Sequence, residues 1–262
     1  MLGLIKNECW QVLHKKKLYL SLGFLLANLL INIFQIKVYV DQEVLAMNGQ
    51  SFPLQILSGS SFFIAIIITV LLADMVCEEY RQGTFKTALA HPIHRYQLVT
   101  AKLVGMVFII AILIGFTVLI SYIIGNLVFP WGDHILVQGN PLIVKGQRLQ
   151  GFHGVSTTLL AGLGFFLSVF GFSMIIFFFA FAFEKTTVTI GIGVALVLLT
   201  NLATDIKILK EYFVGSFMNI LPSMIMTDLG LRVIMPKIVI SILYVLVFYS
   251  LSMIYFSKKD VI

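Results

Sequence analysis

Residues 155–183 read VSTTLLAGLGFFLSVFGFSMIIFFFAFAF, a run that contains no charged side chain. A helix needs about 20 apolar residues to cross the hydrocarbon core of a membrane, so this run is long enough to span one. The rest of the 262-residue chain has the same character, because 59% of its residues are hydrophobic and only 11% are charged. Soluble domains carry about 25% charged residues. Soluble enzymes, nucleic-acid-binding domains and disordered chains are therefore excluded, and an integral membrane protein is expected.

Further apolar segments lie on both sides of this one. They cover residues 18–36, 56–73, 103–129, 186–203 and 238–256, which gives six expected membrane helices. We therefore predict an all-α, polytopic membrane protein whose transmembrane domain covers residues 18–256. The stretch 212–234 is also apolar, but it holds Asp228 and Arg232. Each charge at the centre of a span costs about 2.5–3.5 kcal/mol, so we interpret this stretch as one or two short helices at the outer interface, broken near Pro222.

The basic residues predict the orientation. With the N-terminus inside, the inner segments hold 11 Lys and Arg residues and the outer segments hold 7. The bias is strongest at Lys15, Lys16 and Lys17, directly before the first span. We expect a multi-pass protein of the cell inner (cytoplasmic) membrane with both termini in the cytoplasm, a short tail at 257–262, and outer loops at 129–154 and 204–237. The net charge of +6 then points to anionic membrane lipid and not to nucleic acid.

Residues 1–17 form a separate N-terminal arm. At 100° per residue, its apolar side chains fall within one arc, and Glu8, Gln11 and Lys15 lie on the other side. This pattern predicts an amphipathic helix on the inner membrane surface, with a solvated tail as the alternative. The apolar arc consists of Leu2, Ile5, Cys9, Val12 and Leu13.

The inner loop 74–102 is polar but contains many helix-forming residues. Gly83 and Thr84 interrupt it, and Thr84 is a suitable N-cap for a short helix over 85–90 that Pro92 ends. A second helix is expected to run from about Arg95 into the third span. A short helix on the inner surface, joined to two spans, is a handle by which a soluble partner could tilt both. The alternative interpretation is a solvated loop.

The loop carries the pattern Glu79-x-x-x-Gly83-Thr84, followed by Leu89, Pro92, Arg95 and Lys102. This pattern resembles the type-2 ABC exporter permeases, the six-span membrane subunits of bacitracin and lantibiotic immunity pumps and of sodium or drug efflux systems. In that family the short helix after Gly-Thr is the coupling helix, which sits in a groove of a separate ATP-hydrolysing subunit. The resemblance implies that the ATPase-coupling residues are Glu79, Gly83, Thr84, Phe85, Lys86, Leu89, Pro92 and Arg95.

The resemblance also implies a role for one acidic residue. In the family, the acidic residue at the inner end of the second span helps to fix the cytoplasmic helices to one another. By position this residue is Glu79, with Glu78 as the second choice. Arg95 is its expected cationic partner, and Arg81 is the alternative.

The energy source is expected to lie on another polypeptide. No G-x-x-x-x-G-K-[ST] phosphate-binding loop occurs in these residues. We therefore predict a non-catalytic subunit without a cofactor of its own, with ATP and Mg on a separate ABC ATPase. Six spans make half of such a transporter, so a second copy or a related permease is expected. The resemblance implies export, and the lack of charge inside the expected spans favours a hydrophobic or amphipathic substrate. An antimicrobial peptide or a drug is our preferred substrate, with a lipid and sodium as the alternatives.

Three amides in the first span, Asn28, Asn32 and Gln35, follow i, i+4, i+7 spacing and share one face. They are our candidates for a substrate pathway, and a bridge between helices is the alternative. No ionisable side chain falls inside an expected span, which favours a partner over an ion gradient as the energy source. An ion-coupled transporter or channel remains the main alternative.

An intramembrane enzyme is a further alternative. The pair Glu78-Glu79 resembles the paired glutamates of the CAAX-type membrane proteases, but Arg81 follows the second glutamate by two residues instead of four. None of the five histidines lies inside an expected span, so a metal or a base at membrane depth is not predicted. His91 and His94 have no third ligand near them, and we expect surface histidines and no metal site.

Overall fold

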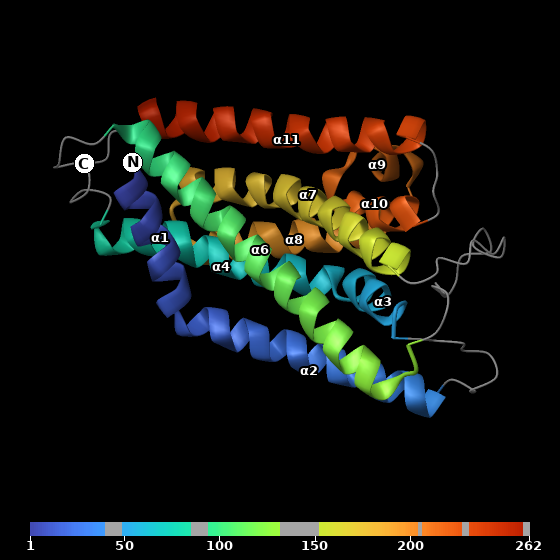
Figure 1. Ribbon diagram of the computed structural model, residues 1–262. Coiled ribbons are helices and arrows are strands. Elements are labelled where there is room, and N and C mark those ends of the chain that lie inside the picture. Colours follow the sequence, from blue (N-terminus) through green and yellow to red (C-terminus); the bar gives the residue numbers. More distant parts are fainter. Residues whose placement is uncertain (40–48, 85–93, 132–151, 204–205, 227–230, 259–262) are drawn as a thin grey trace.

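The computed structural model describes residues 1–39, 49–84, 94–131, 152–203, 206–226 and 231–258, and all regular secondary structure in these ranges is helical (Figure 1). Within them, five helices are long and apolar enough to cross a membrane. The all-α, multi-pass class predicted from the sequence is therefore confirmed. The five helices are α2 (Lys16–Tyr39), α4 (Ser61–Gln82), α6 (Arg95–Val128), α7 (Phe152–Phe183) and α11 (Leu231–Lys258).

A further apolar helix, α8 (Thr186–Ala203), corresponds to the expected fifth span. Its 18 residues cover about 27 Å at 1.5 Å per residue, slightly less than the roughly 30 Å hydrocarbon core. The long helices lie side by side, and the short helix α1 (Leu2–His14) crosses one end of the bundle (Figure 1). We call this end the terminal end, because the N-terminus, the end of α11, the end of α4 and the start of α6 lie there. The opposite end holds the short helices α3 (Phe52–Gly59), α9 (Lys207–Tyr212) and α10 (Phe217–Met226).

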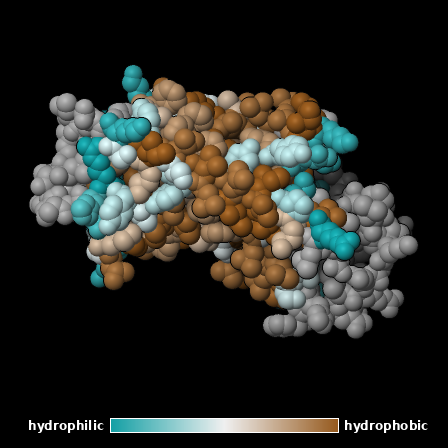
Figure 2. Space-filling view, turned by 90° about the horizontal axis from the view of Figure 1, so that it is seen from above, coloured by the Kyte–Doolittle hydropathy of each residue, from teal (hydrophilic) through white to brown (hydrophobic). Residues whose placement is uncertain are grey.

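The core forms around α7, which packs against α4, α6, α8, α10 and α11. Its side chains Phe165, Phe172, Phe177 and Phe181 are fully buried. In the most apolar stretch of each helix, 67% of the residues are buried in α4 and in α7, but only 11% in α2 and in α11. The outer helices thus turn apolar side chains away from the protein. On the face seen in Figure 2, hydrophobic residues fill the middle and hydrophilic ones gather towards both ends, as the surface of a membrane-spanning bundle requires.

The predicted second span, 56–73, differs from the structure at both ends. The chain forms two helices there, α3 and α4, which meet at Ser60. The Ser60 hydroxyl donates a hydrogen bond to the Asn28 side-chain oxygen of α2 at 3.2 Å, so the junction is held by a neighbouring helix. At the other end, α4 continues to Gln82 and carries Asp74, Glu78 and Glu79 in helical geometry. The acidic residues do not end the helix, because ion pairs described below balance their charges.

The ambiguous stretch 212–234 contains no single spanning helix in its described part. The chain forms α9, a 3₁₀ turn at Val214–Ser216, α10, and then the start of α11 at Leu231. The expectation of short helices is confirmed, but the break near Pro222 is wrong, because α10 runs through this residue. An interior proline removes one backbone donor and crowds the carbonyl oxygen four residues earlier, at a cost of about 3 kcal/mol. Phe217 and Leu221, however, are fully buried on the same helix. Burial of this apolar face accounts for the continuous helix.

Candidate functional site

Helix α1 forms as predicted, but its orientation differs from the expected one. Its buried side chains are Glu8 and Val12, whereas Leu2 is 84% exposed. Helix α1 packs mainly against α6. Glu8 was expected on the solvated polar side, and this was wrong, because the helix turns its flank with Glu8 and Val12 into the protein while Asn7 and His14 stay exposed. The apolar residues Leu2, Trp10 and Leu13 remain exposed at the terminal end of the bundle.

The partner of Glu8 is a fully buried lysine on α6. The Lys102 Nζ lies 2.7 Å from the Glu8 Oε1, and it also donates a hydrogen bond to the Glu79 carboxylate of α4. The three side chains are 0%, 9% and 14% exposed, in the order Lys102, Glu8 and Glu79. We call these residues the ion cluster. It joins α1, α4 and α6 through one ammonium group and two carboxylates.

The expected cationic partners of Glu79 were wrong. Arg81 forms an exposed ion pair with Glu78 one turn earlier on α4. Arg95 donates hydrogen bonds from Nη1 to the carbonyl oxygens of Phe256 at 3.0 Å and Ser257 at 3.1 Å, which ties the start of α6 to the end of α11. Lys102 lies two turns, or about 10 Å, further along α6, and this places it level with Glu79.

A second group of charges ties the turn between α1 and α2 to α4. Asp74 is buried and pairs with Lys17, and its Oδ2 lies 3.6 Å from the Lys15 Nζ. These residues line a cavity of about 510 Å³ that opens at the terminal end. The α1–α2 turn is thereby held against α4 beside the expected coupling loop. The cavity is lined by Gln11, Lys15, Lys16, Lys17, Asp74, Glu78, Glu79, Gln82 and Thr84.

The expected coupling loop is described at its two flanks. Gly83 has a φ of +71° and ends α4 in the left-handed conformation that glycine adopts at little cost. Thr84 follows and is exposed. Helix α6 begins at Arg95 as predicted, after a reciprocal cap between His94 and Gln97. Four of the expected coupling residues, Phe85, Lys86, Leu89 and Pro92, lie outside the described residues.

The three candidate pathway amides do not act as one set. Asn28 is buried and holds the α3–α4 junction through Ser60. The Asn32 side chain donates to the Asn28 carbonyl oxygen at 2.8 Å, while Gln35 is exposed. For Asn28 the structure therefore shows a bridge between helices, the second of the two uses considered from the sequence.

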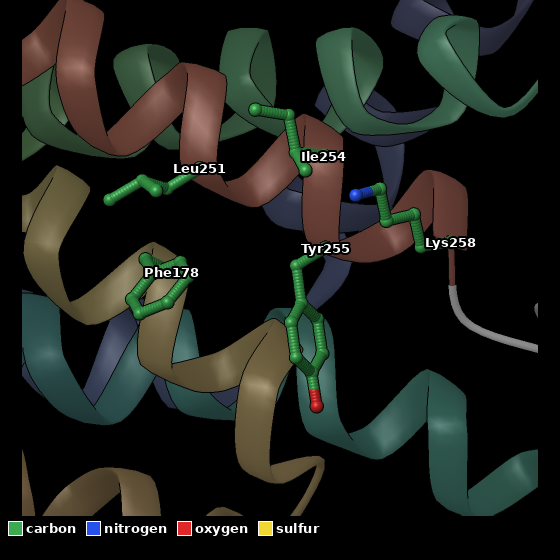
Figure 3. Close-up of a pocket in the computed structure, with 5 residues that line it drawn as sticks. All are labelled: Phe178, Leu251, Ile254, Tyr255 and Lys258. Atoms are coloured by element: carbon green, nitrogen blue, oxygen red, sulfur yellow. The ribbon is translucent and has the colours of Figure 1, made fainter.

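A smaller groove of about 350 Å³ lies between α7 and α11 at the terminal end (Figure 3). Four of its lining residues are apolar or aromatic, and Lys258 contributes the one charged group. The Tyr255 hydroxyl donates a hydrogen bond to the Ala182 carbonyl oxygen at 3.1 Å, which links α11 to α7. This lining holds no set of groups suited to acid–base or nucleophilic chemistry. The lining residues are Phe178, Leu251, Ile254, Tyr255 and Lys258.

Within the described ranges, no group of three or more His, Cys, Asp or Glu side chains could hold a metal ion. The most buried group of charges in the described residues is the ion cluster, of which sequence reasoning identified only Glu79 as a site residue. Lys102 was placed in the loop pattern but was not expected to be buried. One signal in the sequence was available: Lys102 directly precedes the apolar segment 103–129, and a charged side chain in that position needs a counter-ion if it is buried.

The comparison with protein families shows a match over most of the chain. A family described as a protein of unknown function (DUF2705) matches residues 22–262, which leaves out α1 and the first residues of α2. The search of curated proteins gives no match.

Proposed function

Because the chain belongs to the DUF2705 family, whose description assigns no activity, we propose a function from the ion cluster and the helices around it. We propose that the protein is the permease subunit of an ABC exporter. It would move a hydrophobic or amphipathic substrate, such as an antimicrobial peptide or a drug, across the cytoplasmic membrane. The energy would come from a separate ATPase subunit.

The ion cluster is the observation that carries this proposal. Helices α4 and α6 border residues 85–93, which include the expected coupling helix over 85–90, and Glu79 and Lys102 join these two helices to each other and to α1. Removing one partner of a buried ion pair leaves an uncompensated charge, so such a link resists separation. A force that a soluble subunit applies at residues 85–93 therefore reaches both helices together. This is the mechanical property that a coupling handle needs.

The proposal takes α8 as the sixth span, beside the five longer helices. An even number of crossings agrees with the position of the N-terminus and the end of α11 at the same end of the bundle (Figure 1). The terminal end would be cytoplasmic, because Lys15, Lys16 and Lys17 lie there. Helix α1 would then lie along the inner membrane surface, with Leu2 and Trp10 directed towards lipid. Two such permeases, as copies or as related chains, would enclose the substrate pathway.

An ion-coupled transporter is the second candidate, and one observation favours it. We predicted no ionisable side chain inside a span, yet Lys102 is fully buried within α6. However, Lys102 lies seven residues from the start of this helix, near the bundle end, and both of its carboxylate partners are bound to it. Ion pathways place their ionisable groups deeper in the membrane. The position of the cluster therefore fits a fixed joint better than an ion route.

Thiol labelling of intact cells tests the orientation. In a background carrying Cys9→Ser and Cys77→Ala, Lys207→Cys should react with a membrane-impermeant maleimide, and Lys16→Cys should react only after the membrane is permeabilised. Both positions are exposed, so accessibility depends on the side of the membrane. The reverse pattern would place the proposed handle outside the cell, where no ATPase could reach it.

ATP-dependent labelling tests the coupling. Inverted vesicles from the native host, which would contain the ATPase, are prepared with Thr84→Cys in the same background. We expect ATP with vanadate to slow maleimide labelling at this position at least tenfold, because a bound ATPase subunit would cover the handle.

Matched variants show whether the effect passes through the ion cluster. Adding Glu79→Gln to Thr84→Cys should reduce the slowing of maleimide labelling by ATP. Glu78→Gln should leave this slowing unchanged, because Glu78 pairs with Arg81 and Gln82 of its own helix. Lys207→Cys, at the opposite end, should label at the same rate with and without ATP after permeabilisation. An unchanged labelling rate at Thr84→Cys on addition of ATP would overturn the proposed function.

A further inference from the structure

The opposite end of the bundle contains a second charged cavity, distant from the ion cluster. It has a volume of about 590 Å³ and lies between α9, α10 and α11. The three elements meet there because α9 and α10 turn back along the end of the bundle before α11 begins (Figure 1). The cavity is lined by Lys207, Lys210, Glu211, Tyr212, Ile220, Val233, Pro236, Lys237 and Ile240.

The polar part of this cavity is strongly basic. Three ammonium groups, those of Lys207, Lys210 and Lys237, face a single carboxylate, Glu211. The Lys237 Nζ lies 4.8 Å from the ring centroid of the buried Phe217, so a cation–π contact places this charge against the cavity wall. None of the three lysines forms an ion pair with a residue in the described ranges. The cavity therefore carries two positive charges that no described carboxylate balances.

The apolar part of the cavity continues onto the outer surface of the bundle. Ile220, Val233, Pro236 and Ile240 form this side, and further along α11 the side chains Val239 and Leu243 are 57% and 56% exposed. On α9, Ile208 is 71% exposed next to the lysines. A basic cavity thus opens directly onto an apolar strip that faces the membrane interior.

We propose that this cavity binds the phosphate headgroup of an anionic membrane lipid. Phosphate oxygens accept strong, charge-assisted hydrogen bonds from ammonium groups. A lipid held there would lay one acyl chain along the exposed side of α11. Its phosphate would then contact the lysines, and its acyl chain would contact apolar side chains. A zwitterionic lipid brings its own cation, which the two unbalanced charges repel, and a cationic peptide is disfavoured for the same reason.

This proposal does not depend on ATP-driven export, and its test uses the purified full-length chain without an ATPase. The protein is extracted in mild detergent and incubated with equal amounts of phosphatidylglycerol and phosphatidylcholine, and bound lipid is counted by native mass spectrometry. We expect phosphatidylglycerol to be retained at least tenfold more than phosphatidylcholine. Near an anionic surface each lysine contributes about fivefold in affinity, so the triple variant K207Q/K210Q/K237Q should lose roughly a hundredfold.

Two controls test whether the lysines of this cavity hold the lipid. Lys258→Gln removes a lysine beside the groove at the terminal end and should leave lipid retention unchanged, and the triple variant should keep the thermal midpoint of the parent. Inorganic phosphate at 10 mM, about a hundredfold above the lipid, should not displace phosphatidylglycerol, because it lacks the acyl chain. Equal retention of the two lipids, an unaffected triple variant or displacement by inorganic phosphate would each overturn the proposal.

Discussion

Replacing Lys102 with methionine should lower the free energy of unfolding by about 3–5 kcal/mol. The Lys102 Nζ is the counter-ion of two buried carboxylates, and it lies 2.7 Å from Glu8 and within hydrogen-bonding distance of Glu79. Methionine fills a similar volume but carries no charge. Glu8 and Glu79 would then face each other without a cation. The repulsion between their carboxylates could fall only if α1 moved away from α4 and α6.

The measurement can use the fully buried thiol of Cys77 on α4 in a background that carries Cys9→Ser, because Cys9 is only half-buried, whereas Cys77 should react with a maleimide fluorophore only when the bundle opens on heating. The triple variant E8Q/K102M/E79Q removes all three charges and should recover at least half of the lost stability. Arg81→Met is the matched control, since its ion pair with Glu78 is exposed and contributes about 0.5 kcal/mol. Thermal midpoints of Lys102→Met and the parent that agree within error would contradict a stabilising role for the cluster.

Apolar segments made the overall architecture predictable from the sequence. The six segments expected to cross the membrane are helical over almost all of their described residues, with a break at Ser60 in the second, because about 20 apolar residues in a row have few other stable arrangements. The start of α6 at Arg95 and the short helices near Pro222 followed from equally local signals, the proline at 92 and a pair of charges. Such features depend on neighbours within a few residues.

Pairings between distant residues were not predictable in the same way. Glu8 and Lys102 are 94 positions apart, and the polar side of α1 looks like a solvated face until α6 is placed beside it. Glu79 was identified by position, yet Arg95, two turns before Lys102 on the same helix, was assigned as its partner. The register between α4 and α6 decides whether Arg95 or Lys102 is level with Glu79. This register cannot be read from a single sequence. The α3–α4 junction at Ser60 depends in the same way on Asn28 from another helix.

Gly193→Ala should destabilise the protein by about 1–3 kcal/mol, because it overpacks the contact between α8 and α4. A Cβ atom at this position would lie 2.1 Å from the Thr69 Cγ2 and 3.0 Å from its Oγ1. Thr69 cannot easily turn aside, since its hydroxyl donates to the Ala65 carbonyl oxygen at 2.8 Å and the side chain is fully buried. Helix α8 must therefore move away from α4 to make room.

Gly191 supplies the matched control on the same helix, because a Cβ built there meets no atom within 4 Å. Gly191→Ala should leave stability unchanged or raise it by up to about 1 kcal/mol through helix propensity. The double variant T69A/G193A removes the clashing methyl and hydroxyl and should recover most of the loss, although the Thr69 Cβ position is still 3.2 Å away. Equal thermal midpoints for the two single glycine variants would show that α8 does not approach α4 this closely. The result also bears on the proposed function, in which α8 is the sixth span and both termini lie on one side of the membrane.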